Sequence, residues 1–157
     1  MITLSTSRIL DSVHALAALE MLTASESTRL LLAPLLDRGR RSLLAPLVLD
    51  SFASALLEIL PYVESTGLGG EEDPSELPEL LRIDLRLPRT PASATATLVR
   101  RNLEIAVTFG VLETALLGSA PTSSVAGKFA SRRAASIATL LSALHSSAVP
   151  PVRTPSY

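Results

Sequence analysis

Cysteine and glutamine are absent from the 157 residues, and asparagine occurs once, at Asn102. Without cysteine the chain forms no disulfide and no thiolate metal site. A shortage of thermolabile side chains is typical of proteins from hot environments. Thirteen arginines against a single lysine fit the same habitat, although a GC-rich genome would produce the same excess. A thermophilic source is therefore one of two explanations that the composition allows.

Long apolar runs are also missing. No stretch approaches the roughly eighteen consecutive apolar residues that a membrane-spanning helix needs, and Asp11, His14 and Glu20 interrupt the N-terminal segment where a secretory signal would be unbroken. We therefore expect a cytoplasmic protein, or a virion component if the chain is a coat protein, with no membrane partner. The length fits one domain. A hydrophobic content of 47% beside 18% charge is high for a monomer and favours an oligomer or an assembly subunit.

Apolar residues recur at every third or fourth position over much of the chain, which predicts helices. The expected helices cover residues 7–24, Ser27 or Thr28 to Gly39, Ser42 to about Val63, Thr90 or Ser93 to Gly118, and Thr122 or Ser123 through Ser146. Residues 103–117 are apolar on nearly every face and should be buried centrally. The pentapeptide Leu-Leu-Ala-Pro-Leu occurs at 31–35 and 43–47, which is too few copies for a stacked repeat. Two helices that meet at Gly39 explain it better.

Residues 64–91 interrupt this helical pattern. Residues 64–79 are acidic and rich in glycine and proline, which predicts an exposed loop. The segment LLRIDLRLP, residues 80–88, alternates apolar and charged side chains and predicts a short strand or extended arm. A lone strand is unstable, so it must pair with another chain or lie on the helices. The fold class expected is all-α: a single-domain bundle of about five helices over residues 1–149, with this insertion between the third and fourth helices and a Pro-rich tail at 150–157.

The formal net charge of −1 conceals a division along the chain. Residues 1–79 hold five basic and twelve acidic side chains, a net of −7, whereas residues 80–157 hold nine basic and three acidic ones, a net of +6. Guanidinium groups bind phosphate through two hydrogen bonds and stay charged at any relevant pH, so clusters of them suit a nucleic-acid backbone. The candidate nucleic-acid-binding residues are Arg38, Arg40, Arg41, Arg82, Arg86, Arg100, Arg101, Lys128, Arg132 and Arg133.

The same clusters have a plainer interpretation. They can be solvated helix faces, or they can pair with carboxylates, as Arg100 can with Glu104 four residues later. A sequence pI of about 6.1 is well below that of a typical nucleic-acid-binding domain. Three phenylalanines and two tyrosines supply little surface for base stacking, so any binding is expected to be through the backbone.

Catalytic and metal motifs are not evident. Neither His14 nor His145 belongs to a Glu-x-x-His or His-x-x-x-His pair, so no metal or cofactor site is expected. The segment LVRRNLEIAVTFG, with Arg101 and Asn102, resembles the motif of the all-helical HEPN ribonucleases, and Arg8 with His14 has the spacing of that motif alone. The resemblance implies an RNA-cleaving site, but Ala, Val and Thr occupy 106–108, where the histidine that acts as general acid or base should fall. We therefore expect no enzyme.

In size, class and charge the chain is similar to the small helical subunits of CRISPR effector complexes and to the helical coat proteins of archaeal filamentous viruses. This likeness implies a non-enzymatic subunit of a larger assembly that contacts a nucleic-acid backbone through its arginines. The alternative is a protein-only adaptor or homo-oligomeric module that joins its acidic loop to the basic helix of a neighbour. Arg41, Arg101 and Arg132 on one exposed face would favour nucleic acid; carboxylates opposite them would favour the adaptor.

Overall fold

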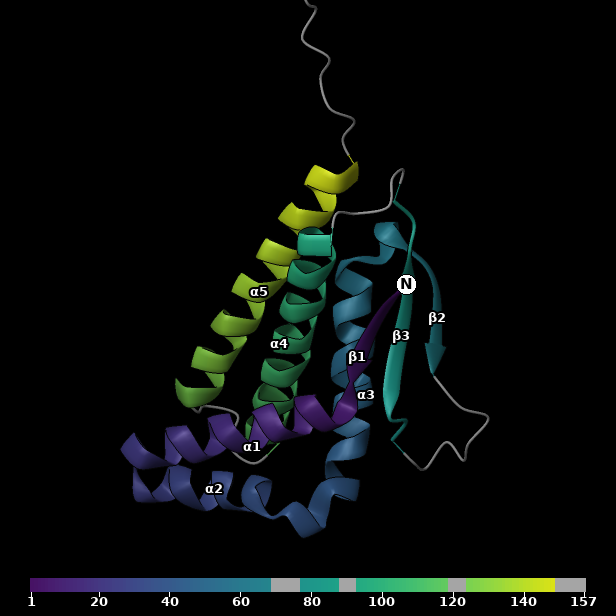
Figure 1. Ribbon diagram of the computed structural model, residues 1–157. Helices are drawn as coiled ribbons and strands as arrows, with labels where there is room; N and C mark the ends of the chain where they lie inside the picture. Colours follow the sequence, from purple (N-terminus) through teal and green to yellow (C-terminus); the bar gives the residue numbers. More distant parts are fainter. Residues whose placement is uncertain (69–76, 88–92, 119–123, 149–157) are drawn as a thin grey trace, which may run out of the picture.

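A computed structural model describes residues 1–68, 77–87, 93–118 and 124–148, with the side chains of all but residues 40, 41, 68 and 148. These residues form five α-helices, two short 3-10 turns and a three-stranded sheet (Figure 1). The helices are α1 (Thr6–Thr23), α2 (Glu26–Leu36), α3 (Arg41–Glu58), α4 (Ser93–Leu117) and α5 (Ser124–Ala148). The strands are β1 (Ile2–Ser5), β2 (Val63–Leu68) and β3 (Leu80–Leu85), and the 3-10 turns are Arg38–Arg40 and Leu60–Tyr62. The prediction of five helices is confirmed.

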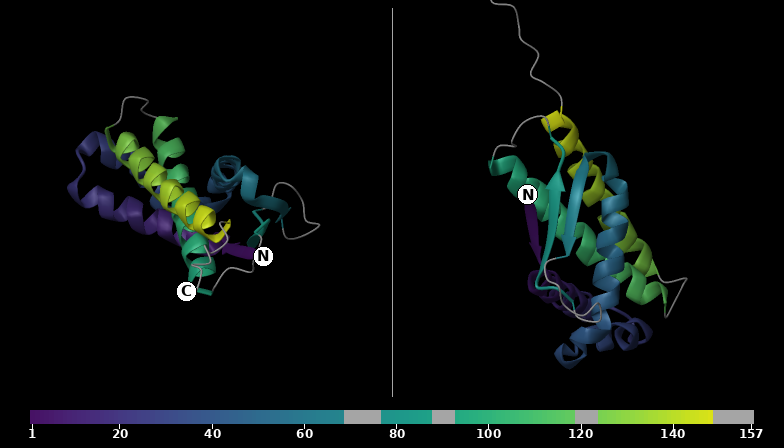
Figure 2. Two further views of the ribbon diagram at one scale, coloured as in Figure 1. Left: turned by 90° about the horizontal axis from the view of Figure 1, so that it is seen from above. Right: turned by 90° about the vertical axis from the view of Figure 1, so that its right-hand side faces the viewer.

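Helix α4 is the centre of the molecule and contacts α5, α3, α1 and β1. Helix α5 runs back alongside it, and α4 lies between α5 and the sheet (Figures 1 and 2). Its buried residues include Val99, Leu103, Val107, Val111, Leu112 and Leu116. The expectation that residues 103–117 are buried centrally is therefore confirmed.

The contact between α3 and α4 is close enough to require a glycine. A Cβ atom added to Gly110 would lie 3.0 Å from both the Cβ and the Oγ of Ser51 on α3, and 3.5 Å from the Nε of Arg133 on α5. Real Cβ atoms in packed interiors rarely approach a neighbouring carbon so closely. Gly110 therefore lets the two helix backbones meet, and this contact helps to fix the position of α4.

Helices α1 and α2 form a hairpin, and α1 also contacts α4 (Figure 1). Each begins with a serine whose hydroxyl satisfies a free backbone amide of the first turn. The Oγ of Ser5 accepts from the Arg8 amide at 3.5 Å, and that of Ser25 accepts from the Thr28 amide at 3.4 Å. The cap of α2 is therefore Ser25, two residues before the earlier of the two expected caps. Arg29 closes the hairpin, because its Nε donates to the Met21 carbonyl at 3.0 Å.

The sheet has the strand order β1-β3-β2, and both pairs are antiparallel. In the β1 and β3 pair, Leu4 lies opposite Leu81 and Ile2 opposite Ile83, and all four side chains are buried. Arg82, between the two buried β3 residues, is exposed. One face of the sheet is thus in the core and the other is wet, as alternation along a strand requires.

The all-α prediction is corrected by this sheet. Residues 80–85 form its central strand, with both partners supplied by the same chain, rather than an extended insertion on a helical bundle. Residues 63–68 were expected to end a helix and begin a loop, but the 3-10 turn around Pro61 ends the helical region and β2 follows it. Strand β1 is too short for its alternation to be detected. The rest of the acidic loop, at 69–76, and the tail at 150–157 lie outside the described residues.

Each described helix was also compared with the length and apolarity that crossing a membrane demands. Among these helices, none satisfies both conditions.

Candidate functional site

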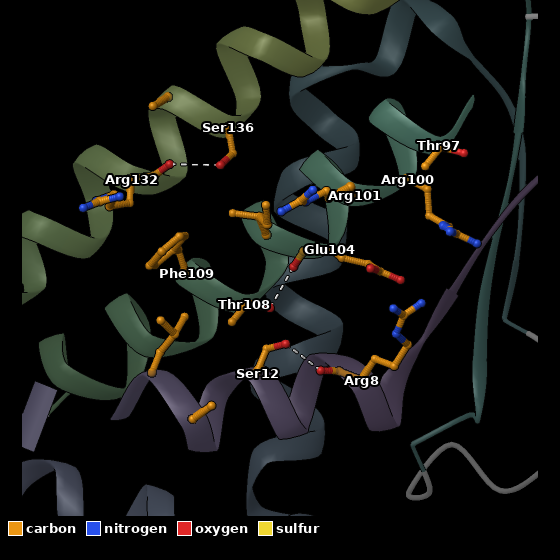
Figure 3. Close-up of a pocket in the computed structure, with 14 residues that line it drawn as sticks. Arg8, Ser12, Thr97, Arg100, Arg101, Glu104, Thr108, Phe109, Arg132 and Ser136 are labelled. Carbon is orange, nitrogen blue, oxygen red and sulfur yellow. Dashed lines mark hydrogen bonds between the residues drawn. The ribbon is translucent and has the colours of Figure 1, made fainter. Parts of the chain in front are cut away.

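A cavity of about 820 Å³ opens between α1, α4 and α5. Four arginines line it: Arg8 from α1, Arg100 and Arg101 from α4, and Arg132 from α5 (Figure 3). We call this cavity the arginine groove. Its other lining residues are Ser12, Ala15, Leu16, Thr97, Glu104, Ile105, Thr108, Phe109, Ala135 and Ser136.

The groove residues come together because each helix contributes one stripe of its surface. On α1 the lining positions are 8, 12, 15 and 16, and on α5 they are 132, 135 and 136. On α4 they are 97, 100, 101, 104, 105, 108 and 109. Steps of three and four residues place side chains on one helix face. The crossing of α1 over α4 and the pairing of α4 with α5 bring the three stripes around one hollow.

The charge in the groove is unbalanced. Glu104 is the one carboxylate among the lining residues, against four guanidinium groups. Its side chain extends toward Arg8 and Arg100 in Figure 3, but it forms no ion pair with either of them. Within the described part of the chain, none of the four arginine side chains has a hydrogen-bond or ion-pair partner, and all four are exposed. The groove therefore presents four free sets of N–H donors.

Three of the hydroxyl groups in the groove donate their protons to helix carbonyls. Ser12 donates to the Arg8 carbonyl at 2.8 Å, Thr108 to the Glu104 carbonyl at 2.8 Å, and Ser136 to the Arg132 carbonyl at 3.2 Å (Figure 3). A hydroxyl group has one proton to donate, so the exposed Ser12 oxygen offers only lone pairs to a ligand, whereas Thr108 and Ser136 are buried, at 3% and 9% exposure. The groove thus combines N–H donors on its arginines with oxygen acceptors between them.

Apolar side chains complete the lining, among them Leu16, Ile105 and Phe109. Phe109 is partly buried, and its ring packs against that of Phe129 on α5, with centroids 5.9 Å apart and a tilt of 33°. Phe129 is buried and does not line the groove. Phe109 therefore has a ring that is supported from one side and reaches the groove on the other.

The predicted site residues divide into groups. Arg100, Arg101 and Arg132 come together in the groove, whereas Arg38, Arg82 and Arg86 are exposed on other parts of the molecule. The side chains of Arg40 and Arg41 lie outside the described residues, so one exposed face shared by Arg41, Arg101 and Arg132 stays a prediction.

Two of the predicted residues have partners within the chain. The Nζ of Lys128 lies 2.6 Å from the Oε2 of Glu20, which joins α5 to α1. The Nη2 of Arg133 donates to the Oγ of Ser54 on α3 at 2.6 Å, while its Nε is buried without a hydrogen-bond partner among the residues described. These contacts favour a structural role for both side chains.

Arg8 is the groove residue that sequence reasoning missed. It was considered only for its spacing to His14, as a possible ribonuclease pair. The available signal was its spacing of four residues from Ser12 on one helix face, but nothing local indicates that this face meets the face of Arg101 on α4.

The histidine that would complete a ribonuclease site is not supplied by another part of the groove. His14 is 7% exposed, and neither of its ring nitrogens has a hydrogen-bond partner in the described residues. Neither His14 nor His145 lines the groove. The amide of Asn102 donates to the Leu98 carbonyl at 2.9 Å and does not reach the groove either. Among the side chains that the structure describes, no group of three His, Asp or Glu residues could hold a metal ion.

Comparisons of the chain with protein-family models, with curated proteins and with solved structures gave no match.

Proposed function

We propose that the chain is a non-enzymatic subunit of a larger assembly and that it binds the phosphate backbone of a nucleic acid in the arginine groove. The observation that carries this proposal is the convergence of Arg8, Arg100, Arg101 and Arg132, from three helices, without a partner for any of them in the described structure. Like charges gathered in one hollow repel each other, and a polyanion relieves this repulsion. A ligand with several phosphates matches several guanidinium forks at once.

Lys128 and Arg133, which were also predicted to bind nucleic acid, differ from the groove arginines because they have partners within the chain. Lys128 is paired with Glu20, and Arg133 reaches Ser54, so their N–H groups are used inside the molecule. The groove arginines make no such contacts in the described part of the fold, although Glu104 lies beside them. Simple charge pairing, the plainer interpretation of these clusters, therefore accounts for Lys128 but not for the groove.

A second observation favours the protein-only alternative for another surface. Leu19 and Leu22 on α1 and Leu30 on α2 are 62%, 73% and 72% exposed. Exposed leucines on both helices of a hairpin favour contact with another protein. Leu22 lies about 9 Å along α1 beyond Leu16, the last α1 residue that lines the groove, at 1.5 Å of rise per residue. An assembly subunit can use both: the hairpin for a neighbouring subunit and the groove for nucleic acid.

The test is a salt titration of binding, by fluorescence anisotropy, to labelled single-stranded and duplex DNA and RNA. The variant R101A/R132A removes two groove charges, and R82A/R86A removes two exposed charges from β3 and its end as a matched control. Each lost phosphate contact should reduce the slope of log K against log salt by about 0.7 to 0.9. We expect the groove variant to weaken binding and flatten the slope, and the control to do neither. Absence of binding at low salt, or equal losses in both variants, would reject the proposal.

A further inference from the structure

We infer that the arginine groove takes a single strand of nucleic acid, with phosphates at the guanidinium groups and one base against Phe109. This inference rests on the proposed function and specifies its ligand. Three features of the groove carry it: its concave shape, the acceptor oxygens of Ser12 and Glu104 among its arginines, and the aromatic ring that reaches it.

Shape excludes a duplex from the interior of the groove. Proteins read duplex DNA with convex elements, an α-helix or a β-ribbon, that enter the major groove. Here the arginines surround a hollow of about 820 Å³, which is in the size range of pockets that hold small molecules. A single strand can turn one nucleotide into such a hollow while its neighbours follow the charged walls.

The donor and acceptor pattern distinguishes a nucleotide from a plain polyanion. Phosphate offers only acceptors, which suit the four guanidinium groups but not the oxygens of Ser12 and Glu104. The Ser12 hydroxyl proton is already donated to the Arg8 carbonyl. The oxygens therefore call for a ligand that also brings O–H or N–H donors, as the sugar hydroxyls of RNA and the ring N–H and amino groups of bases do. Inorganic polyphosphate has no such groups near neutral pH.

Phe109 supplies the stacking surface that a single strand uses. Few aromatic residues occur in the chain, yet this one lies on α4 in the same groove as the arginines, and its ring packs on that of Phe129. Stacking of one base on an aromatic side chain contributes enough affinity that its loss lowers binding by about fivefold or more. The expectation of binding through the backbone alone is thereby extended to one stacked base.

The first experiment compares four probes at the same phosphate concentration, with the full chain in low salt. The probes are labelled oligo(dT) and oligo(U) of about 12 nucleotides, a hairpin duplex of the same length, and inorganic polyphosphate as competitor. We expect one or both single strands to bind about fivefold or more tightly than the duplex and to resist the competitor. Equal binding of the duplex, or equal competition by polyphosphate, would overturn the inference and leave backbone binding intact. If no probe binds, the proposed function fails and the inference fails with it.

The second experiment compares F109L with F129L. Each variant removes one ring of the same pair, but Phe129 is buried outside the groove. We expect F109L to lose about fivefold or more in affinity for the single strand, with an unchanged salt slope, because its loss removes stacking and not charge. F129L should destabilise the fold in thermal unfolding and, below its unfolding transition, bind as the native chain does. Equal affinity of the two variants would overturn the role assigned to Phe109.

Discussion

The contact between α3 and α4 gives a prediction about stability, because Gly110 sits where these helices meet. Alanine in place of glycine inside a helix normally stabilises the protein by about 0.5 to 1 kcal/mol. At Gly110 the new methyl group would lie 3.0 Å from both Cβ and Oγ of Ser51. The Cβ of Ser51 is fixed to its own helix, so the helix backbones must separate, and such overpacking costs about 1 to 3 kcal/mol. We expect G110A to lower the free energy of unfolding by about 1 kcal/mol in total.

The matched control is G127A on α5, where an added Cβ would meet no atom within 4 Å. This variant should stabilise the protein by up to about 1 kcal/mol, because only helix propensity changes. Both values are measured by urea unfolding followed by circular dichroism. If G110A stabilises the chain as much as G127A does, the close approach of α3 and α4 is wrong. Since α4 carries Arg101, Glu104 and Phe109, that result would also undermine the geometry of the groove.

Three further predictions concern the groove, the core and the hairpin. E104Q should raise the affinity for inorganic polyphosphate by about fivefold in competition titrations, because two unit charges about 4 Å apart in water interact with about 1 kcal/mol. This probe has no donor for the carboxylate to accept from, so unchanged affinity would place Glu104 away from the bound phosphates. H14L should raise the free energy of unfolding by about 1 kcal/mol or more in urea, because an apolar side chain replaces a buried imidazole that has no hydrogen-bond partner among the described residues. A loss of stability would show that the imidazole has a partner. We expect the exposed Leu19 and Leu22 to join copies of the chain, so L19S/L22S should shift sedimentation velocity towards the monomer while leaving the fold intact. A native chain that sediments as a monomer, or unchanged association of the variant, would exclude the α1 end of the hairpin as an interface between copies.

The helices could be predicted because each is long enough to repeat its apolar positions several times. Helix α4 was even placed at the centre correctly, since few polar residues interrupt residues 103–117. The sheet could not be predicted as a sheet. Strand β1 has four residues, and its pairing with β3 joins positions about eighty residues apart along the chain, as between Ile2 and Ile83. Such pairings leave no local pattern in the sequence.

The candidate site could be predicted only in part, because spacing along the chain does not show which helix faces meet in the fold. Arg100 and Arg101 are adjacent, so they were recognised as a pair, and Arg132 was recognised beside Arg133. Both Arg100 and Arg101 line the groove, whereas of the second pair only Arg132 does, and this depends on the direction that each helix face takes in the fold. Arg133 faces Ser54 on α3, whereas Arg132 lines the groove, and this difference comes from the packing of α5 on α4. The contribution of Arg8 depends on a helix crossing that no spacing encodes.

We propose that the groove arginines, and not the total charge of the chain, bind the phosphate backbone, and the salt dependence of oligonucleotide binding by the native chain, R101A/R132A and R82A/R86A tests this. The slope of log K against log salt should fall by about 1.4 to 1.8 for the groove variant, two phosphate contacts at about 0.7 to 0.9 each, and stay at the native value for the control. Equal slopes for all three proteins, or no binding by the native chain in low salt, would contradict it.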